Sequence, residues 1–388
     1  MIMRRWENYL IKQGQDFNSF WKELFSERAR NALIVLGLGF DPRTCTGLEA
    51  ILKAGGNGKR DCLIIKCDEG SNSLTNTHTN LVESNRRTLH ELLHNRGNIK
   101  FLNLQMWAAQ GQRRISSRRA NDIFDNLENL AGFTEVTDVI VDISALPISV
   151  YFSLIAKLLY LIDADDRENK GKSIPNLHVI VAENVSLDKR IEQQGIDADP
   201  ICLHGFSGDL ELEATANLPK VWFPILGEGK QTNLRRVYDF LRRPTEICPV
   251  LPSPSLDPRR GDTLMLLEYR ELFFDEFRVD PRDIIYASEQ NPFEAYRQIH
   301  QAVVQYNKAL EVLGGCKVFI SPMSSKLLCL GSLLAAYEIK HSDELDKAGC
   351  RVGIAHLESQ GYQVIEIEKN TSQPELFTLW LAGECYEQ

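Results

Sequence analysis

The chain has 388 residues, of which 43% are hydrophobic and 25% are charged. This composition excludes a disordered or collagen-like chain, and the length predicts two domains. The formal charge of −9 argues against a protein that holds nucleic acid by bulk electrostatics, so direct nucleic-acid binding is not expected.

The sequence also predicts the environment of the protein. The charged start Met1–Trp6 is followed by no apolar leader, and the apolar stretch 143–162 is interrupted by Pro147 and Lys157. The nine Cys include no CxxC pair. We therefore expect a cytoplasmic protein that does not contact a membrane and has mostly buried free thiols.

Residues 1–28 are predicted to form an amphipathic helical arm. Within 4–27, apolar side chains recur at roughly helical spacing: Trp6, Leu10, Phe17, Phe20, Trp21 and Phe25. We expect the arm to pack on its own domain. The alternative is an interface with a protein partner or with a second copy of the chain.

Residues 29–245 are predicted to form a first Rossmann-like domain. Its predicted strands cover 32–38, 62–67, 99–106, 138–143, 177–182 and 221–226. Its predicted helices cover 46–54, 81–95, 120–130 and 234–241, together with an apolar helix that follows the strand 138–143 and ends at about 161. Apolar strands that alternate with helices indicate a parallel sheet covered on both faces.

After the Pro-rich stretch 249–254 the same alternation restarts, so residues 246–388 are predicted to form a second Rossmann-like domain. Its predicted strands cover 248–251, 284–287, 316–320, 352–357 and 363–367. Its predicted helices cover 263–274, 293–313 and 326–339. The fold class that we predict is therefore α/β, with two related Rossmann-like parallel-sheet halves and the N-terminal helical arm.

Ordered correspondences between the halves indicate an internal duplication. Phe40-Asp41-Pro42-Arg43 follows the first predicted strand of one half, and Leu256-Asp257-Pro258-Arg259 follows that of the other. Glu69 and Glu289 follow the second predicted strands. The segments 138–147 and 316–326 are alike in running from a strand into a long apolar helix.

Ligands of open parallel sheets bind beyond the carboxyl ends of the strands, where these segments are predicted to lie. A glycine turn, arginines and helix N-termini with hydroxyl side chains all suit an anion. The predicted ligand-binding residues are Gly37, Gly39, Asp41, Arg43, Glu69, Asp142, Ser144, Asp257, Arg259, Glu289, Ser321, Ser324, Ser325 and Lys326. In the structural alternative, Asp and Arg pair to fix each loop and the serines only cap helices.

The segments VDISALPISVYFSLIAKLL and FISPMSSKLLCLGSLLAA resemble the strand–turn–helix of CRISPR-associated Rossmann-fold (CARF) sensor domains. Their tandem arrangement is similar to that of SAVED sensors. The resemblance implies recognition of a small nucleotide second messenger between the halves, a role in prokaryotic defence, and an effector on a separate chain. The turn 36–41 also resembles the first motif of some S-adenosylmethionine methyltransferases, although glycines are missing before Asp257.

Two other functions remain open in the sequence. His90-Glu91-Leu92-Leu93-His94 is a literal HExxH, the motif of zinc hydrolases, with Lys100 where a third histidine ligand would stand. The chain could also be a scaffold subunit of a protein complex. Our leading hypothesis is a sensor or regulatory subunit for a nucleotide-like or other anionic small molecule. It assigns no catalytic residue, metal or cofactor and favours a binding protein over an enzyme.

Overall fold

The computed structural model describes residues 4–70, 73–108, 114–168, 174–188, 190–364 and 373–386. The chain divides into two compact units. Unit 1 comprises Met1–Gly195 and Ser359–Gln388, and unit 2 comprises Ile196–Glu358.

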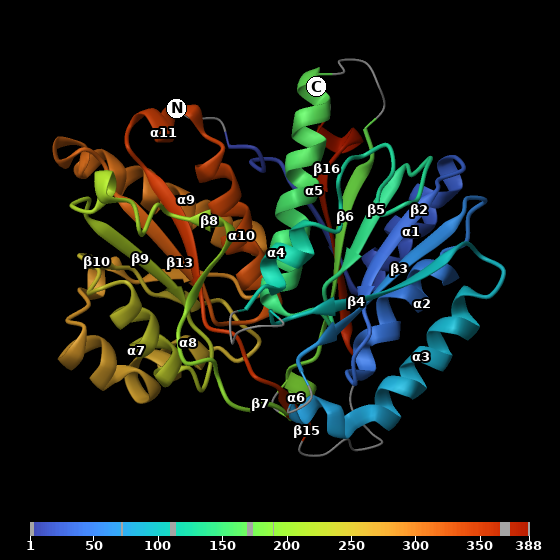
Figure 1. Ribbon diagram of the computed structural model, residues 1–388, viewed down its shortest axis with the longest axis horizontal. Coiled ribbons are helices and arrows are strands. Elements are labelled where there is room, and N and C mark those ends of the chain that lie inside the picture. Colours follow the sequence, from blue (N-terminus) through green and yellow to red (C-terminus); the bar gives the residue numbers. More distant parts are fainter. Residues whose placement is uncertain are drawn as a thin grey trace. The chain divides into compact units, whose positions relative to one another are not determined.

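Unit 1 is built on a seven-stranded sheet of order β1-β16-β6-β5-β2-β3-β4 (Figure 1). The strands are β1 (Leu10–Gln13), β2 (Ala32–Gly37), β3 (Arg60–Asp68), β4 (Ile99–Gln105), β5 (Asp138–Asp142), β6 (Asn176–Glu183) and β16 (Glu375–Ala382). The strands from β4 to β6 in this order are parallel, whereas β16 runs antiparallel to β6 and β1 antiparallel to β16. A separate antiparallel pair joins β7 (Ile191–Gln193) and β15 (Tyr362–Val364).

Helices cover both faces of this sheet (Figure 1). They are α1 (Gly14–Glu27), α2 (Thr46–Lys53), α3 (Thr79–Leu93), α4 (Ser116–Asn121), α5 (Ile148–Glu168) and α6 (Val185–Asp188). All of β2 is buried, which its apolar sequence ALIVLG predicts. Side chains of α1, α2 and α3 share one hydrophobic core with one face of the central strands, and α5 lies on the other face.

Unit 2 has a sheet of order β12-β11-β9-β13-β14-β8, with β10 also paired to β9. Its strands are β8 (Ile201–Ser207), β9 (Lys220–Ile225), β10 (Glu246–Ile247), β11 (Val250–Pro252), β12 (Ile285–Ala287), β13 (Lys317–Pro322) and β14 (Arg351–His356). Only β8 runs antiparallel to its neighbour. The helices are α7 (Gln231–Phe240), α8 (Arg260–Thr263), α9 (Pro292–Ala309), α10 (Lys326–Lys340) and α11 (Asp343–Lys347). Two π-helical turns, Leu264–Glu268 and Glu271–Glu276, follow α8.

The two sheets share one topology, which confirms the predicted α/β fold with two Rossmann-like halves. In each unit the five parallel strands lie in the order third, second, first, fourth, fifth along the chain. Each sheet also adds an antiparallel strand beside the fifth, β16 in unit 1 and β8 in unit 2. The antiparallel strands correct the prediction of purely parallel sheets.

The correspondence between the halves differs by one strand from the predicted one. The first strand of unit 2 is β9, so the predicted first strand 248–251 falls on β11, which is the second. The strand before Glu289 is likewise the third, whereas Glu69 follows the second strand of unit 1. Only the fourth strands, β5 and β13, correspond as predicted.

The predicted division 29–245 and 246–388 differs from the two units for the same reason. Residues before 245 supply β8 and β9 to the sheet of unit 2, and residues after 358 return to unit 1 as β15 and β16. The sequence pattern showed neither β8 nor β16 as a strand. The predicted last strand 363–367 is described only as far as β15.

The N-terminal arm is not one helix. Residues 10–13 form β1, which pairs with β16, and the helix α1 begins only at Gly14. Trp6, Phe17, Trp21 and Phe25 are buried within unit 1, as expected for packing on the arm's own domain. These side chains are therefore not exposed for the alternative, an interface with another chain.

Three other predictions concern a helix, the cysteines and a membrane span. The predicted helix 120–130 is wrong, because α4 ends at Asn121 and the Asn126 side chain accepts a hydrogen bond from the Asn129 backbone, which favours turns. All nine cysteines are free and six are buried, as predicted. Among the described helices, none combines the length and the apolar character needed to cross a membrane.

Candidate functional site

Each unit has one place where the loops after its first and fourth strands diverge, and we call this place the switch point. Helices that follow these two strands cover opposite faces of the sheet, and ligands of open α/β sheets commonly bind beside such loops at the carboxyl edge. In unit 1 the loops follow β2 and β5, and in unit 2 they follow β9 and β13.

The same four-residue motif, Leu-Gly-x-Gly, occupies both switch points. Leu36-Gly37-Leu38-Gly39 ends β2, and Leu226-Gly227-Glu228-Gly229 follows β9. A Cβ added to Gly37 would lie 2.7 Å from the carbonyl oxygen of Ala145, and one added to Gly227 would lie 2.5 Å from that of Met323. The first glycine of each motif thus lets the loops after the first and fourth strands touch.

Leu226-Gly227-Glu228-Gly229 is not among the residues predicted from the sequence, because the predicted first strand of the second half, 248–251, is the second strand of unit 2. No glycines stand between that strand and Asp257. An apolar strand followed by Leu-Gly-x-Gly in both halves was the signal that could have found it.

In unit 1, the glycine loop is closed by ion pairs of its own chain. The Arg43 guanidinium, 5% exposed, donates to both carboxylate oxygens of Asp41, and its Nη1 lies 2.8 Å from Oδ1 of Asp188. Burial would lower the pKa of Arg43, but these carboxylates outweigh it and raise the pKa above its ordinary value. The side chain of Asn85 also donates to the carbonyl oxygen of Gly39. This arrangement is the predicted structural alternative, in which Asp and Arg fix the loop.

The polar side chains among the remaining predicted residues of unit 1 also have hydrogen-bond partners in unit 1. Asp142 accepts the Ser144 backbone N–H, and the Ser144 hydroxyl accepts the N–H of Ala182 in β6. Glu69, after β3, accepts hydrogen bonds from the hydroxyls of Ser73 and Thr75. The structure therefore brings Gly37, Gly39, Asp41, Arg43, Asp142 and Ser144 to one switch point, where the polar contacts tie its loops together.

The Asp-Pro-Arg motif is a local turn and not a mark of the duplication. It occurs a third time at Asp280-Pro281-Arg282, before β12 at the amino end of the strand. In all three copies the Asp carboxylate accepts the backbone N–H of the Arg, with Pro between them fixing the turn. In the copy that follows β11, Asp257 and Arg259 are both exposed.

The arginine that joins the loops of unit 2 is the next residue, Arg260. It donates through Nε and Nη2 to the two carboxylate oxygens of Glu228, each at 2.7 Å, and through Nη1 to Glu289. Glu228 lies in the glycine loop after β9 and Glu289 follows β12. Arg260 therefore links the loops of the first three strands, and the predicted Glu289 takes part through it.

The loop after β13 is the second half of the switch point in unit 2. It contains the predicted Ser324 and Ser325, whereas the predicted Ser321 lies in β13 and the predicted Lys326 begins α10. Ser321 accepts a hydrogen bond from the indole N–H of Trp222. In the described part of the chain, the hydroxyl oxygens of Ser324 and Ser325 are buried and have no hydrogen-bond partner. Ser325 precedes α10 but does not cap it through its side chain.

A cationic residue stands beside each loop of this switch point. Lys230 directly precedes α7 and is partly buried, and burial lowers the pKa of its ammonium group. Lys326 is the first residue of α10. Two helix N-termini, the glycine loop and these cations therefore lie at the carboxyl edge of one sheet, and anions favour helix N-termini and cations.

The HExxH segment has a different environment. His90 and His94 are exposed, and the helix α3 ends at Leu93, so the second histidine lies beyond the helix. Among the described residues, no three His, Cys, Asp or Glu side chains are grouped so that they could hold a metal ion.

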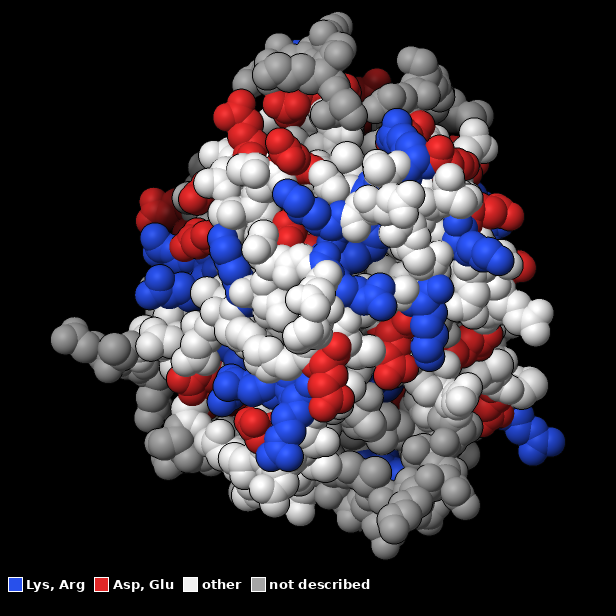
Figure 2. Space-filling view, turned by 90° about the vertical axis from the view of Figure 1, so that its right-hand side faces the viewer, with Lys and Arg blue, Asp and Glu red and all other residues white. Residues whose placement is uncertain are grey.

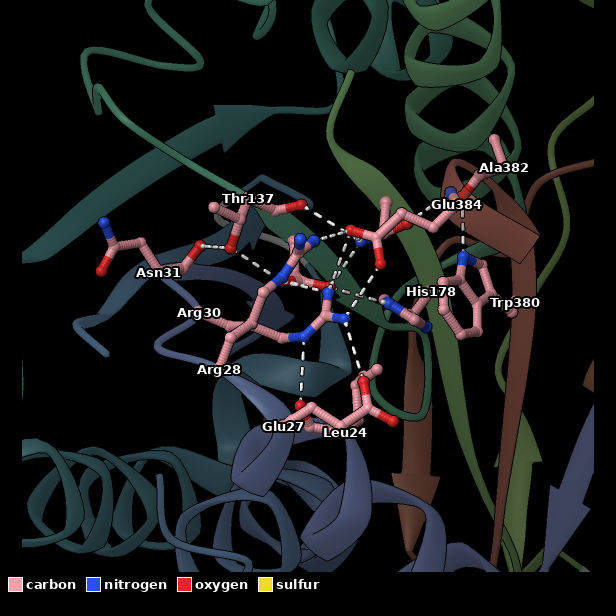
Figure 3. A network of polar contacts seen from close by, with 12 residues as sticks. Leu24, Glu27, Arg28, Arg30, Asn31, Thr137, His178, Trp380, Ala382 and Glu384 are labelled. Atoms are coloured by element: carbon pink, nitrogen blue, oxygen red, sulfur yellow. Dashed lines mark hydrogen bonds and ion pairs between the residues drawn. The ribbon is translucent and has the colours of Figure 1, made fainter. Parts of the chain in front are cut away.

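A buried polar network lies at the amino edge of the sheet in unit 1 (Figure 3). Arg30, 2% exposed, donates to Asp138 at 3.3 Å and to Glu384 at 3.0 Å. Nε2 of His178 lies 3.2 Å from the same Asp138 carboxylate. The network joins the segments before β2 and after β16 to β5 and β6. Because it lies opposite the carboxyl edge, we assign it to stability and not to ligand binding.

Comparisons with known proteins add little. No family model matches the chain. No curated protein matches it either. The chain is similar to a solved structure described as NadR protein in complex with NR, at 12% identity and a TM-score of 0.25, covering 86% of this chain and 92% of that one.

Figure 2 shows the charged side chains on one face of the molecule. On the face shown in Figure 2, Lys and Arg side chains alternate with Asp and Glu over the described residues. A continuous basic surface is the usual footprint of nucleic-acid binding.

Proposed function

We propose that the chain is a sensor or regulatory subunit that binds a phosphate-bearing, nucleotide-like small molecule at the switch point of unit 2. The observation that carries this proposal is the pair of buried hydroxyl oxygens of Ser324 and Ser325, which have no partner in the described chain and adjoin the glycine loop. A buried hydroxyl without a partner is costly, and a bound phosphate oxygen would accept its hydrogen bond.

The surroundings supply the rest of an anion site. The Gly229 N–H, which donates to the partly exposed Glu268 carboxylate, belongs to the loop after β9, and α10 begins directly after Ser325. Lys230, Lys326 and Arg260 provide positive charge at the same edge. Hydroxyls, amides and cations together bind phosphate through charge-assisted hydrogen bonds.

The biological part of the proposal rests on the resemblance of residues 141–159 and 319–336 to CARF and SAVED sensors. The second of these segments contains Ser324, Ser325 and Lys326. On this basis we propose a role in prokaryotic defence, with a separate effector chain as partner, in the cytoplasm.

Isothermal titration calorimetry with pyrophosphate and with ATP tests the site. The Ser324→Ala/Ser325→Ala double variant should bind at least tenfold more weakly, because each lost hydrogen bond is worth about 1 kcal/mol. The matched control is Ser342→Ala, a serine of unit 2 that caps α11. Equal affinity of the double variant and the wild type would refute the assignment, as would a wild-type chain that binds neither probe.

A further inference from the structure

The glycine loop of unit 2 is held by two consecutive residues of another segment. The N–H of Gly229 donates to the Glu268 carboxylate. The Tyr269 hydroxyl accepts the N–H of Lys230 at 3.1 Å and donates to the carbonyl oxygen of Gly227. Glu268 and Tyr269 therefore bind three backbone groups of the loop in which we place the anion site.

The two contacts differ in kind. Tyr269 is fully buried and belongs to the hydrophobic core of unit 2, so its hydroxyl is a structural partner. Glu268 is partly exposed, and its carboxylate accepts a hydrogen bond from a backbone N–H. A phosphate oxygen binds such an N–H group in the same way, because both are anionic acceptors.

Two other carboxylates lie in or beside the same loop. Glu228 and Glu289 both bind Arg260, the cation that links the loops of the first three strands. The chain thus places its own anions on donors that an anionic ligand would use. Any ligand with a phosphate must compete with them.

We propose that Glu268 is an internal competitor that occupies the Gly229 N–H in the ligand-free chain and is displaced by a phosphate of the ligand. This inference rests on the proposed function and deepens it, because it names the group that regulates the site. Ligand binding then releases the Glu268 side chain from the Gly229 N–H. The backbone of the segment that contains Glu268 is expected to change in response.

That segment is suited to respond. Glu268 ends one π-helical turn, Leu264–Glu268, and a second turn, Glu271–Glu276, follows it after two residues. Such turns are rare and recur at functional sites, since their hydrogen-bond register is less regular than that of an α-helix. We expect the backbone of residues 264–276 to lose protection when the ligand binds.

The test is Glu268→Gln, which keeps the shape and an oxygen acceptor but removes the charge. Hydrogen bonds to charged groups are the stronger ones, so the neutral side chain should compete less. Pyrophosphate affinity should rise about fivefold, measured by calorimetry. The matched control is Glu271→Gln, an exposed carboxylate three residues further on, whose affinity should stay within about twofold of the wild type. Amide hydrogen exchange of residues 264–276 in the wild-type chain is the second readout.

The outcomes separate this inference from the proposed function. Tighter binding by Glu268→Gln than by Glu271→Gln, with faster exchange in the wild-type segment upon pyrophosphate addition, supports both. Wild-type binding with equal affinity in all three proteins overturns the role of Glu268 alone. If neither the wild type nor Glu268→Gln binds pyrophosphate while both remain folded, the proposed function fails and the inference fails with it.

Discussion

Gly37 and Gly227 occupy the same position in two different sheets. Gly37 ends the first parallel strand of unit 1 and Gly227 follows that of unit 2, and each lies against the backbone of the segment after the fourth strand, at Ala145 and at Met323. The rest of the two loops has diverged. The loop of unit 1 is closed by Arg43 and its carboxylate partners, whereas that of unit 2 adjoins two buried hydroxyls without partners.

The contact at Gly37 predicts that Gly37→Ala destabilises unit 1 by roughly 1–3 kcal/mol, because the new methyl group must displace the Ala145 backbone. The matched control is Gly39→Ala in the same loop, where the nearest atom would be 4.0 Å from the added Cβ. Urea unfolding followed by tryptophan fluorescence measures both. Equal stability of the two variants would contradict the close approach of the loops.

The sequence predicted the alternation of strands and helices because the central strands are apolar on both faces and turns separate them. It did not predict which strands pair. The strands β1 and β16 join one end of the sheet only through long-range antiparallel pairing, which leaves no short-range pattern. The boundary between the units was misplaced for the same reason.

The candidate site was predicted in part. Ser324, Ser325 and Lys326 were found because a strand that runs into a helix through hydroxyl residues is a local signal. Gly227 and Arg260 were not predicted, because the halves were aligned on Asp41-Pro42-Arg43 and Asp257-Pro258-Arg259. These residues form a turn that occurs at all three places where Asp precedes Pro-Arg. Local capping chemistry produced the apparent repeat.

The two predicted arginine clamps should behave differently from each other. Arg43→Ala leaves two carboxylates without their buried partner and should lower the free energy of unfolding by about 3 kcal/mol, with pyrophosphate affinity unchanged. Arg259→Ala removes an exposed side chain and should change stability by less than about 0.5 kcal/mol. Urea unfolding measures the stability of each variant, and calorimetry measures its affinity for pyrophosphate. Loss of pyrophosphate binding in a stable Arg43→Ala protein would restore Arg43 as a ligand-binding residue.

The HExxH segment should not bind zinc specifically. His94 lies beyond the end of α3, so the two histidines do not share a helical face as zinc-binding pairs do. Equilibrium dialysis against Zn²⁺ should give the same zinc content for the wild type and for His90→Ala. One zinc per chain that is lost in His90→Ala would reopen the hydrolase interpretation.

Acid should destabilise unit 1 in two steps through the network around Asp138. His178 is fully buried among aromatic rings, with those of Trp21 and Trp380 centred 4.9 Å and 4.8 Å from its own. Burial lowers its pKa although Asp138 opposes the shift. The folded chain therefore resists protonation that the unfolded chain accepts, and stability begins to fall as the pH drops below about 6.5.

The second step involves the carboxylates. Burial by itself would raise the pKa values of Asp138 and Glu384. Hydrogen bonding to His178 and the charge of Arg30 instead lower the pKa of Asp138 below its ordinary value, and Arg30 lowers that of Glu384 in the same way. Their contribution to stability is complete above about pH 4 and is lost as the pH falls through the lower, folded-state values.

The change that isolates the first step is His178→Gln, which keeps a donor for Asp138 but cannot titrate. The free energy of unfolding of this variant should be lower at neutral pH because a core side chain has changed, yet nearly constant between pH 7 and 5. The wild type should lose stability over that range. His90→Gln, which removes an exposed histidine of the same unit, should follow the wild-type curve. Urea unfolding at several pH values provides the measurement, and a slope that persists in His178→Gln would assign the first step to another group.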